Sequence, residues 1–235
     1  TNKLLGTDVD VVGGKTGFDH ARGKNLIGTF FQPSRVIVDL SHLETLPARE
    51  RACGLAQIAK IALVRDAGLL EALERNADAI ARGEIEALRP IVRAAVQAKI
   101  RVVSEDEQEA GVRALLNLGH TLGHALEAYA GYARWLHGEA VAIGTVLELA
   151  ATERMGLTPP GIGARAEALL RRLGLPTRVD AADLAAAWPF VKSDKKREAA
   201  TLKLPVATGA GEGRVVAVAM EDLRRAVVDG APTER

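Results

Sequence analysis

A nearly continuous helical pattern covers residues 48 to 155, and it restricts the possible folds more than any other feature. Apolar side chains recur there at intervals of three and four residues, and alanine and leucine are frequent. Glycines and charged residues divide the pattern into ARERACGLAQIAKIALVRD, LLEALERNADAIARG, EIEALRPIVRAAVQAKIRVVSED, GVRALLNLGHTLGHALEAYAG and GEAVAIGTVLELAATERMG. Pro47 suits the start of the first helix. The sequence therefore predicts a mainly α fold.

The two ends of the chain look different from this helical region. Residues 1–47 are rich in glycine and β-branched residues, and RVIVDL (35–40) is predicted to form a strand. After residue 155 we expect two shorter helices, ARAEALLRRLG and DAADLAAAW, then a β-hairpin in TLKLPVATGAGEGRVVAVAM and a closing helix in MEDLRRAVVDG. The predicted organisation is a connecting segment over 1–47, a helical domain over 48–230 and a frayed tail over 231–235.

Composition excludes several classes of protein. The chain has 235 residues, of which 48% are hydrophobic, so it can bury a core. A net charge of +1 gives no reason to expect a nucleic-acid or membrane surface, and no apolar run approaches a membrane span of about 20 residues. The single cysteine, Cys53, rules out an internal disulfide and fits the cytoplasm. Because the sequence starts at Thr1 without a methionine, we expect a piece of a longer product.

Histidines gather between positions 120 and 137. His120 and His124 are four residues apart on a helical pattern, so they share a face and could bind one metal ion, with His137 returning as a further ligand. The alternative is that these histidines cap or pack within a helix bundle. His120 and His124 each follow a glycine, which costs a helix about 1 kcal/mol relative to alanine. Such glycines indicate close approach of a ligand or another backbone.

Basic residues suggest an anionic ligand. Lys60, Lys99, Arg113, Lys195 and Lys196 lie in apolar or helical contexts, where each taken singly is better explained as part of a solvated helix face.

Lys15 and Lys24 differ because they lie in glycine-containing loops, which can offer backbone N–H groups and an ammonium to phosphate. The glycine spacing is not that of a Walker A motif. The residues alone thus indicate a metal and an anionic small molecule.

Several distinctive stretches are spread over nearly the whole chain. They are GGKTG (13–17), GKN (23–25), QP (32–33), LPARE (46–50), VVSEDEQEAGVRALLNLGHTLGHALE (102–127), WLHGEAVAIG (135–144) and SDKK (193–196). In their order and spacing they together resemble 3-dehydroquinate synthase. The resemblance implies an NAD- and divalent-metal-dependent lyase that converts 3-deoxy-D-arabino-heptulosonate 7-phosphate to 3-dehydroquinate and phosphate in the shikimate pathway. It covers the helical C-terminal half and the connecting segment, without the N-terminal Rossmann-like half that holds most of the NAD.

The resemblance implies specific residue roles. His120 and His137, with Gln57, match metal-ligand positions for zinc or cobalt, and His124 matches a residue that handles protons. Positions that bind the sugar acid phosphate correspond to Lys60, Lys99, Arg113, Asn117 and one of Lys195 and Lys196, with Asn25 matching a neighbouring active-site asparagine. Cofactor contacts correspond to Lys15, Lys24, His42, Leu43, Glu44 and Thr45. A cytoplasmic homodimer is expected, with a Rossmann half in the same or another chain.

The sequence departs from the family pattern at several positions. Gln57 stands in GLAQIAK, where the family has a glutamate ligand, and a neutral amide binds a divalent ion more weakly. Val9 stands where the family has aspartate; only a shift of register would let Asp8 or Asp10 replace it. A milder change places Asp19 where asparagine is common. These departures leave open a non-catalytic ligand-binding or regulatory homologue, and a cyclase for a related sugar phosphate is a third alternative.

Overall fold

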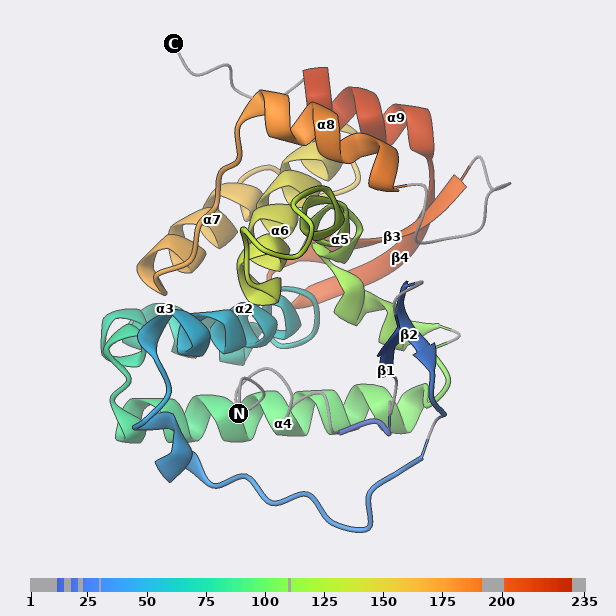
Figure 1. Cartoon of the computed structure of the whole chain (residues 1–235). Helices are drawn as coiled ribbons and strands as arrows, with labels where there is room; N and C mark the ends of the chain where they lie inside the picture. Colours follow the sequence, from blue (N-terminus) through green and yellow to red (C-terminus); the bar gives the residue numbers. More distant parts are fainter. Residues whose placement is uncertain are drawn as a thin grey trace.

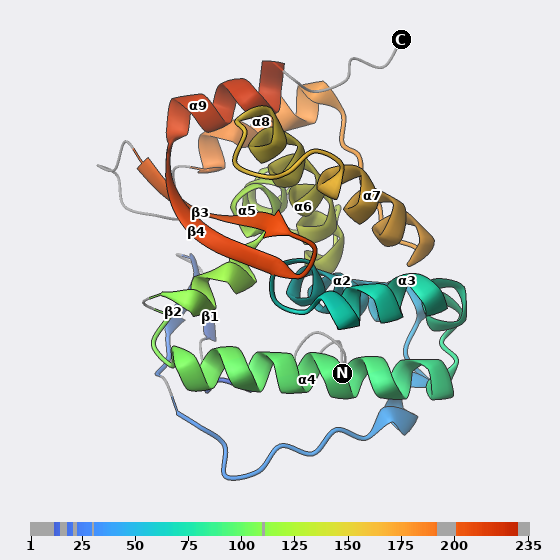
Figure 2. The same ribbon diagram turned by 180° about the vertical axis from the view of Figure 1, so that it is seen from behind.

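The computed structural model describes residues 12–14, 18–20, 23–29, 31–109, 111–191 and 201–229, with the backbone alone for 18–20, 23–27 and 229. Helices α2 (Ala48–Arg65), α3 (Ala67–Arg82) and α4 (Ile85–Glu105) occupy the predicted positions. Figures 1 and 2 show α2 and α3 between α4 on one side and the later helices on the other. Every residue of α2 from Gly54 to Val64 is buried, so any polar side chain there faces the protein interior.

The ends of α3 follow local chemistry. The carboxylate of Asp66 accepts a hydrogen bond from the Leu69 N–H at 3.0 Å, and Gly83 ends the helix in a left-handed conformation.

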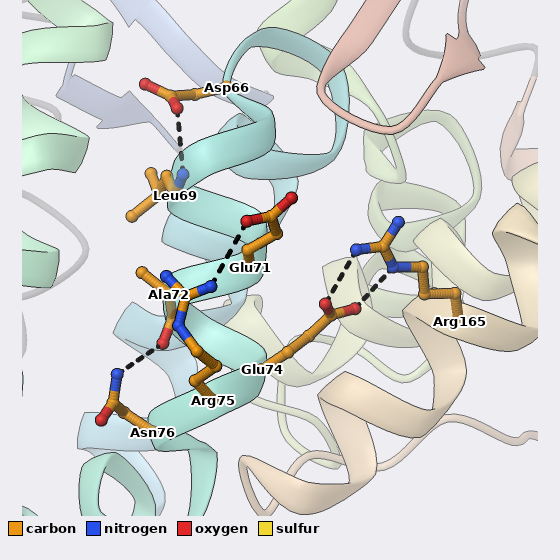
Figure 3. A network of polar contacts seen from close by, with 8 residues as sticks. All are labelled: Asp66, Leu69, Glu71, Ala72, Glu74, Arg75, Asn76 and Arg165. Carbon is orange, nitrogen blue, oxygen red and sulfur yellow. Dashed lines mark hydrogen bonds and ion pairs between the residues drawn. The ribbon is translucent and has the colours of Figure 1, made fainter.

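Arg165 donates two hydrogen bonds, of 2.6 and 2.8 Å, to the carboxylate of Glu74 (Figure 3). This bidentate pair joins α3 to helix α7, Ile162–Arg172.

The predicted single helix over 111–131 is wrong. A 3-10 helix η2 covers Val112–Asn117, and α5 begins afresh at His120 and ends at Tyr129. Gly119 lies between them with φ 78°, a left-handed conformation that interrupts a helix. A side chain at Gly119 would collide with Thr145 and with the Val141 carbonyl of the next helix. The interruption therefore comes from tertiary packing.

The remaining predicted helices and the hairpin are present. Helix α6 covers His137–Arg154 and α8 covers Ala181–Val191. Strands β3 (Thr201–Gly209) and β4 (Glu212–Ala219) pair antiparallel, with Leu204 opposite Val216, and cross behind α5 and α6 in Figure 1. The closing segment starts as α9 (Met220–Arg224) and continues as a π-helix η3 (Arg225–Asp229).

The N-terminal segment differs from the prediction. Residues 35–40 do not form a strand: they run extended to a 3-10 helix η1, Leu40–Leu43, and Ile37 is 77% exposed. A strand needs a partner for its backbone groups, and none of the described residues pairs with this segment. Strand pairing occurs earlier in the chain instead, between β1 (Phe18–His20) and β2 (Gly23–Ile27), two strands that the sequence does not predict.

Two large apolar clusters form the core. The first unites α2, α3, α4 and α7, and the second unites α5 and α8 with the hairpin and the C-terminal helices. Helices α5 and α6 touch through small residues: a side chain at Gly144 would meet the Gly119 carbonyl and, at 2.8 Å, the Gly123 nitrogen. Among the helices described, none has the length and apolar character needed to cross a membrane.

Candidate metal centre

The structure brings the clustered histidines together. His120 is the first residue of α5, His124 lies one turn later, and His137 is the first residue of α6. The ring centroid of His120 is 5.2 Å from each of the other two, and those two are 5.7 Å apart. One possible ligand atom from each residue lies within 4.8 Å of the others. Small movements of these rings would place all three nitrogens around one ion.

The start of α5 is fixed by a buried carboxylate on α6. Glu148 is fully buried and accepts hydrogen bonds from the backbone N–H of Gly119 at 2.8 Å and of Leu122 at 3.0 Å. These N–H groups have no partners within the helix, and a negative charge at a helix N-terminus is favourable. Glu148 therefore positions the turn that carries His120.

The start of α6 is held in a similar way. Glu139 accepts hydrogen bonds of 2.6 and 2.7 Å from Arg49 of α2 and one of 2.9 Å from the backbone N–H of Leu136. Burial opposes ionisation of the Glu139 carboxyl. The hydrogen bonds from Arg49 and from the Leu136 N–H, together with the Arg49 charge, outweigh burial and lower the pKa of Glu139. The pair fixes His137, two residues earlier, relative to α2.

Two of the histidines are oriented through Nδ1. The Nδ1 of His120 lies 3.2 Å from the Leu118 carbonyl oxygen, and the Nδ1 of His137 lies 3.0 Å from Oε2 of Glu127. When Nδ1 donates in both, Nε2 of each ring keeps its lone pair for a ligand. Burial, and next the positive charge of Lys60, lower the pKa of His120 well below its usual range, so its imidazole is neutral. Imidazole ligands and a buried carboxylate partner suit zinc or cobalt.

Gln57 and Lys60 form a buried polar pair on α2. The Lys60 ammonium donates a 2.6 Å hydrogen bond to Oε1 of Gln57, and both residues are less than 7% exposed. Among the described residues, Nε2 of Gln57 has no hydrogen-bond partner. The positive charge of Lys60 reaches His120, so α2 faces the histidine cluster.

The other predicted ligand-binding residues are buried or engaged. Lys99 on α4 is 6% exposed, and Arg113 on η2 is 2% exposed. Arg113 donates hydrogen bonds to the carbonyl oxygens of Glu107 at 2.6 Å and Gly13 at 3.0 Å. The side-chain amide of Asn117 donates to Glu109 at 2.6 Å. Lys60, Lys99 and Arg113 are buried, so the prediction that each of them, taken singly, lies on a solvated helix face is wrong for these three residues.

Other predicted positions are only partly placed. Residues 42–45 lie in and after η1, with Leu43 buried and the other three residues exposed. Glu44 lines an open groove of about 770 Å³ along α4. Lys24 and Asn25 lie in β2, where only the backbone is described. Outside the described residues lie Val9, Lys15, Lys195 and Lys196, with Asp8 and Asp10.

Sequence reasoning missed the carboxylates that support the site. Glu127, Glu139 and Glu148 are all buried, on α5 and α6. The available signal was a glutamate within an otherwise apolar helix face, as in VLELA around Glu148. Such a residue is almost never buried without a partner.

The fold and the histidine cluster together define a class: a helical domain with a candidate imidazole metal centre near buried cations. Residues 54–197 match the family described as 3-dehydroquinate synthase C-terminal, and residues 2–53 match 3-dehydroquinate synthase N-terminal. The chain belongs to the 3-dehydroquinate synthase family. This confirms the resemblance drawn from the sequence stretches.

Solved structures support the same fold. The chain is similar to 2-epi-5-epi-valiolone synthase from Streptomyces hygroscopicus subsp. jinggangensis 5008 with NAD+ and Zn2+ bound, with 28% identity and a TM-score of 0.82 over 97% of this chain. It also shares the fold of 2-deoxy-scyllo-inosose synthase complexed with carbaglucose-6-phosphate, NAD+ and Co2+, with 23% identity and a TM-score of 0.83 over 96% of this chain. The matches span 64% of each of those chains.

Proposed function

We propose that this chain is the metal- and substrate-binding part of an NAD- and metal-dependent sugar phosphate cyclase. The preferred activity is that of 3-dehydroquinate synthase: conversion of 3-deoxy-D-arabino-heptulosonate 7-phosphate to 3-dehydroquinate and phosphate in the shikimate pathway. The observation that carries the proposal is the histidine cluster within reach of the buried Lys60 charge. A cytoplasmic homodimer completed by a Rossmann half is part of the same proposal, with no nucleic-acid or membrane partner.

The residues present fit a divalent ion. His120 and His137 would hold it through Nε2, because their Nδ1 atoms face Leu118 and Glu127. When bound, the ion supplies Lewis-acid polarisation of substrate oxygens. Glu127 on α5 contacts the His137 ring, and Glu139 and Glu148 on α6 hold the helix starts that carry the two rings.

Cations of this chain would bind the anionic groups of the substrate. Lys60, Lys99 and Arg113 are held on three different elements, α2, α4 and η2, so they can surround a ligand that carries both phosphate and carboxylate. The backbone carbonyls that accept from Arg113 fix its guanidinium in one orientation. Such fixed charges orient a polyanion and lower the entropic cost of reaching the reactive geometry.

The proposal predicts stoichiometric zinc binding. Calorimetric titration of the chain should show one tight site that is abolished in His120→Ala and retained in His42→Ala, whose histidine is exposed on η1. Absence of zinc binding by the native chain would overturn the metal-dependent function. It would favour the non-catalytic homologue, for which the replacement of a glutamate ligand by Gln57 is the specific argument.

Substrate class is tested by ligand binding to the zinc-loaded chain. We expect 3-deoxy-D-arabino-heptulosonate 7-phosphate to bind more tightly than glucose 6-phosphate, because only the former carries a carboxylate for a second cation. Equal binding would favour a cyclase for a neutral sugar phosphate. Phosphate release should be measured with NAD present, and it should be slow in a chain that spans 64% of its solved relatives.

A further inference from the structure

We propose that His124, and not Gln57, supplies the third protein ligand of this metal centre, so that three imidazoles hold the ion. The inference rests on the proposed metal-dependent function. It departs from the roles that the family resemblance implies, in which Gln57 occupies the ligand position and His124 handles protons. A ring bound through its lone pair has no base to offer, so the two roles exclude each other in one state.

The geometry of the histidines carries the proposal. His124 lies one helical turn after His120. One possible ligand atom from each of His120, His124 and His137 lies within 4.8 Å of the other two. Separations of this size surround a point from which tetrahedral Zn–N bonds of about 2.0–2.1 Å can be reached after small side-chain rotations. Two ligands come from one face of α5 and the third from the first turn of α6, and the close packing of these helices keeps the distances short.

Gln57 is poorly suited to ligate. Its oxygen accepts the Lys60 hydrogen bond at 2.6 Å, and the opposite amide orientation would set two donors against each other. The amide nitrogen, which has no partner among the described residues, lacks a lone pair for a metal. A cation bound at the Gln57 oxygen would also approach the Lys60 ammonium, and like charges repel strongly in a buried site.

Charge balance supports the same ligand set. An imidazole that binds an ion through its lone pair is a neutral ligand, and the buried carboxylate of Glu127, in hydrogen-bond contact with His137, could offset part of the charge of the ion. An all-nitrogen donor set favours zinc, cobalt, nickel and copper over magnesium, calcium and manganese. The centre should therefore discriminate strongly against the oxygen-seeking ions.

The test is cobalt and zinc binding by the full chain and its variants. Co2+ binding is followed by its visible absorption, and Zn2+ affinity by competition with a chelator. We expect His124→Ala to weaken zinc by at least about 100-fold, as loss of a direct ligand should exceed the 10–100-fold typical of an outer-shell loss. Gln57→Ala and the surface control His42→Ala should leave the affinity unchanged. Loss of binding in Gln57→Ala with retention in His124→Ala would overturn the proposal.

Ligand counting on the native chain removes any dependence on how a variant folds. X-ray absorption at the zinc edge should show scattering from three imidazoles, and a count of two would overturn the inference. Such a count, with tight zinc binding, would leave the proposed metal-dependent function standing. No zinc or cobalt binding at all would instead remove the proposed function together with the inference.

Discussion

The carboxylate of Glu148 on α6 accepts a 2.8 Å hydrogen bond from the backbone N–H of Gly119, at the turn where α5 begins. A fully buried acid thus holds the backbone that presents the first histidine of the cluster. This relationship couples the stability of the α5–α6 pair to the geometry of the metal centre.

Replacing Glu148 by glutamine should destabilise the fold. The amide keeps one acceptor but turns an NH2 group toward a backbone N–H, and an unsatisfied buried donor costs about 1–3 kcal/mol. Chemical denaturation measures the change, and Glu86→Gln, an exposed acid paired with Arg89 on α4, is the control. Equal stability of both variants would show that the Glu148 contacts contribute little.

Glu127→Gln should weaken zinc binding without removing a ligand. The carboxylate orients the His137 ring through its contact with Nδ1, and loss of such a partner typically costs about 10–100-fold in affinity. Chelator competition measures the effect, with the exposed Glu71→Gln as control. An unchanged affinity would mean that His137 is oriented by other contacts.

Gln57→Glu should strengthen zinc binding by about tenfold or more, equivalent to at least about 1.4 kcal/mol. The new carboxylate would face Lys60 and offset a positive charge that now stands near the histidines. The measurement is the same competition assay on the folded variant. No gain in affinity would contradict this account of the α2 face.

Gly144→Ala should separate α5 from α6. The added methyl group would press on the Gly119 carbonyl and lie 2.8 Å from the Gly123 nitrogen, and overpacking of this kind costs about 1–3 kcal/mol. Gly68→Ala is the matched control, because its nearest neighbour is a side-chain oxygen at 3.5 Å. Thermal unfolding should distinguish the two variants, and a native-like Gly144→Ala protein would contradict the close packing.

Cys53 should react slowly with alkylating reagents. Burial, followed by the nearby negative charge of Glu139, raises the pKa of its thiol to about 11. At pH 8 the thiolate fraction, and hence the rate, should be about 100-fold below that of a thiol with an ordinary pKa near 9. The rate should keep rising through pH 10, whereas a plateau near pH 9 would contradict the shift.

The raised pKa of Cys53 also means that the fold loses stability as the pH rises from the ordinary thiol pKa of about 9 toward 11.

Helix prediction succeeded where local signals were complete. The sequence between Ala48 and Glu105 has apolar residues at helical spacing. Pro47 marks the start of the first helix and Gly83 the end of the second, and the structure has its helices at these positions. It failed at Gly119, because the left-handed turn there is imposed by Thr145 and the Val141 carbonyl, which are distant in the sequence.

A strand over 35–40 was predicted from composition alone, but a strand also requires a neighbour, which the sequence does not specify.

Part of the candidate site was visible in the sequence for a geometric reason. His120 and His124 share a helix face by spacing, so their proximity needs no tertiary information. The turn that places His137 beside the other two histidines contains two consecutive left-handed residues, Gly131 at φ 59° and Tyr132 at φ 60°. A tyrosine in that conformation cannot be predicted from its residue type. The buried glutamates act through contacts up to 90 residues apart, as in Arg49 and Glu139.

The order in which the site forms during folding follows from how its parts are distributed along the chain. The histidines belong to adjacent helices joined by a short turn, so the α5–α6 hairpin can bring them together by closing a small loop. Lys60 on α2, which is separated from this hairpin by α3 and α4, meets it only after a longer loop has closed, which is the slower process. The metal half of the site should therefore form early, and zinc added during refolding should speed the folding of the chain.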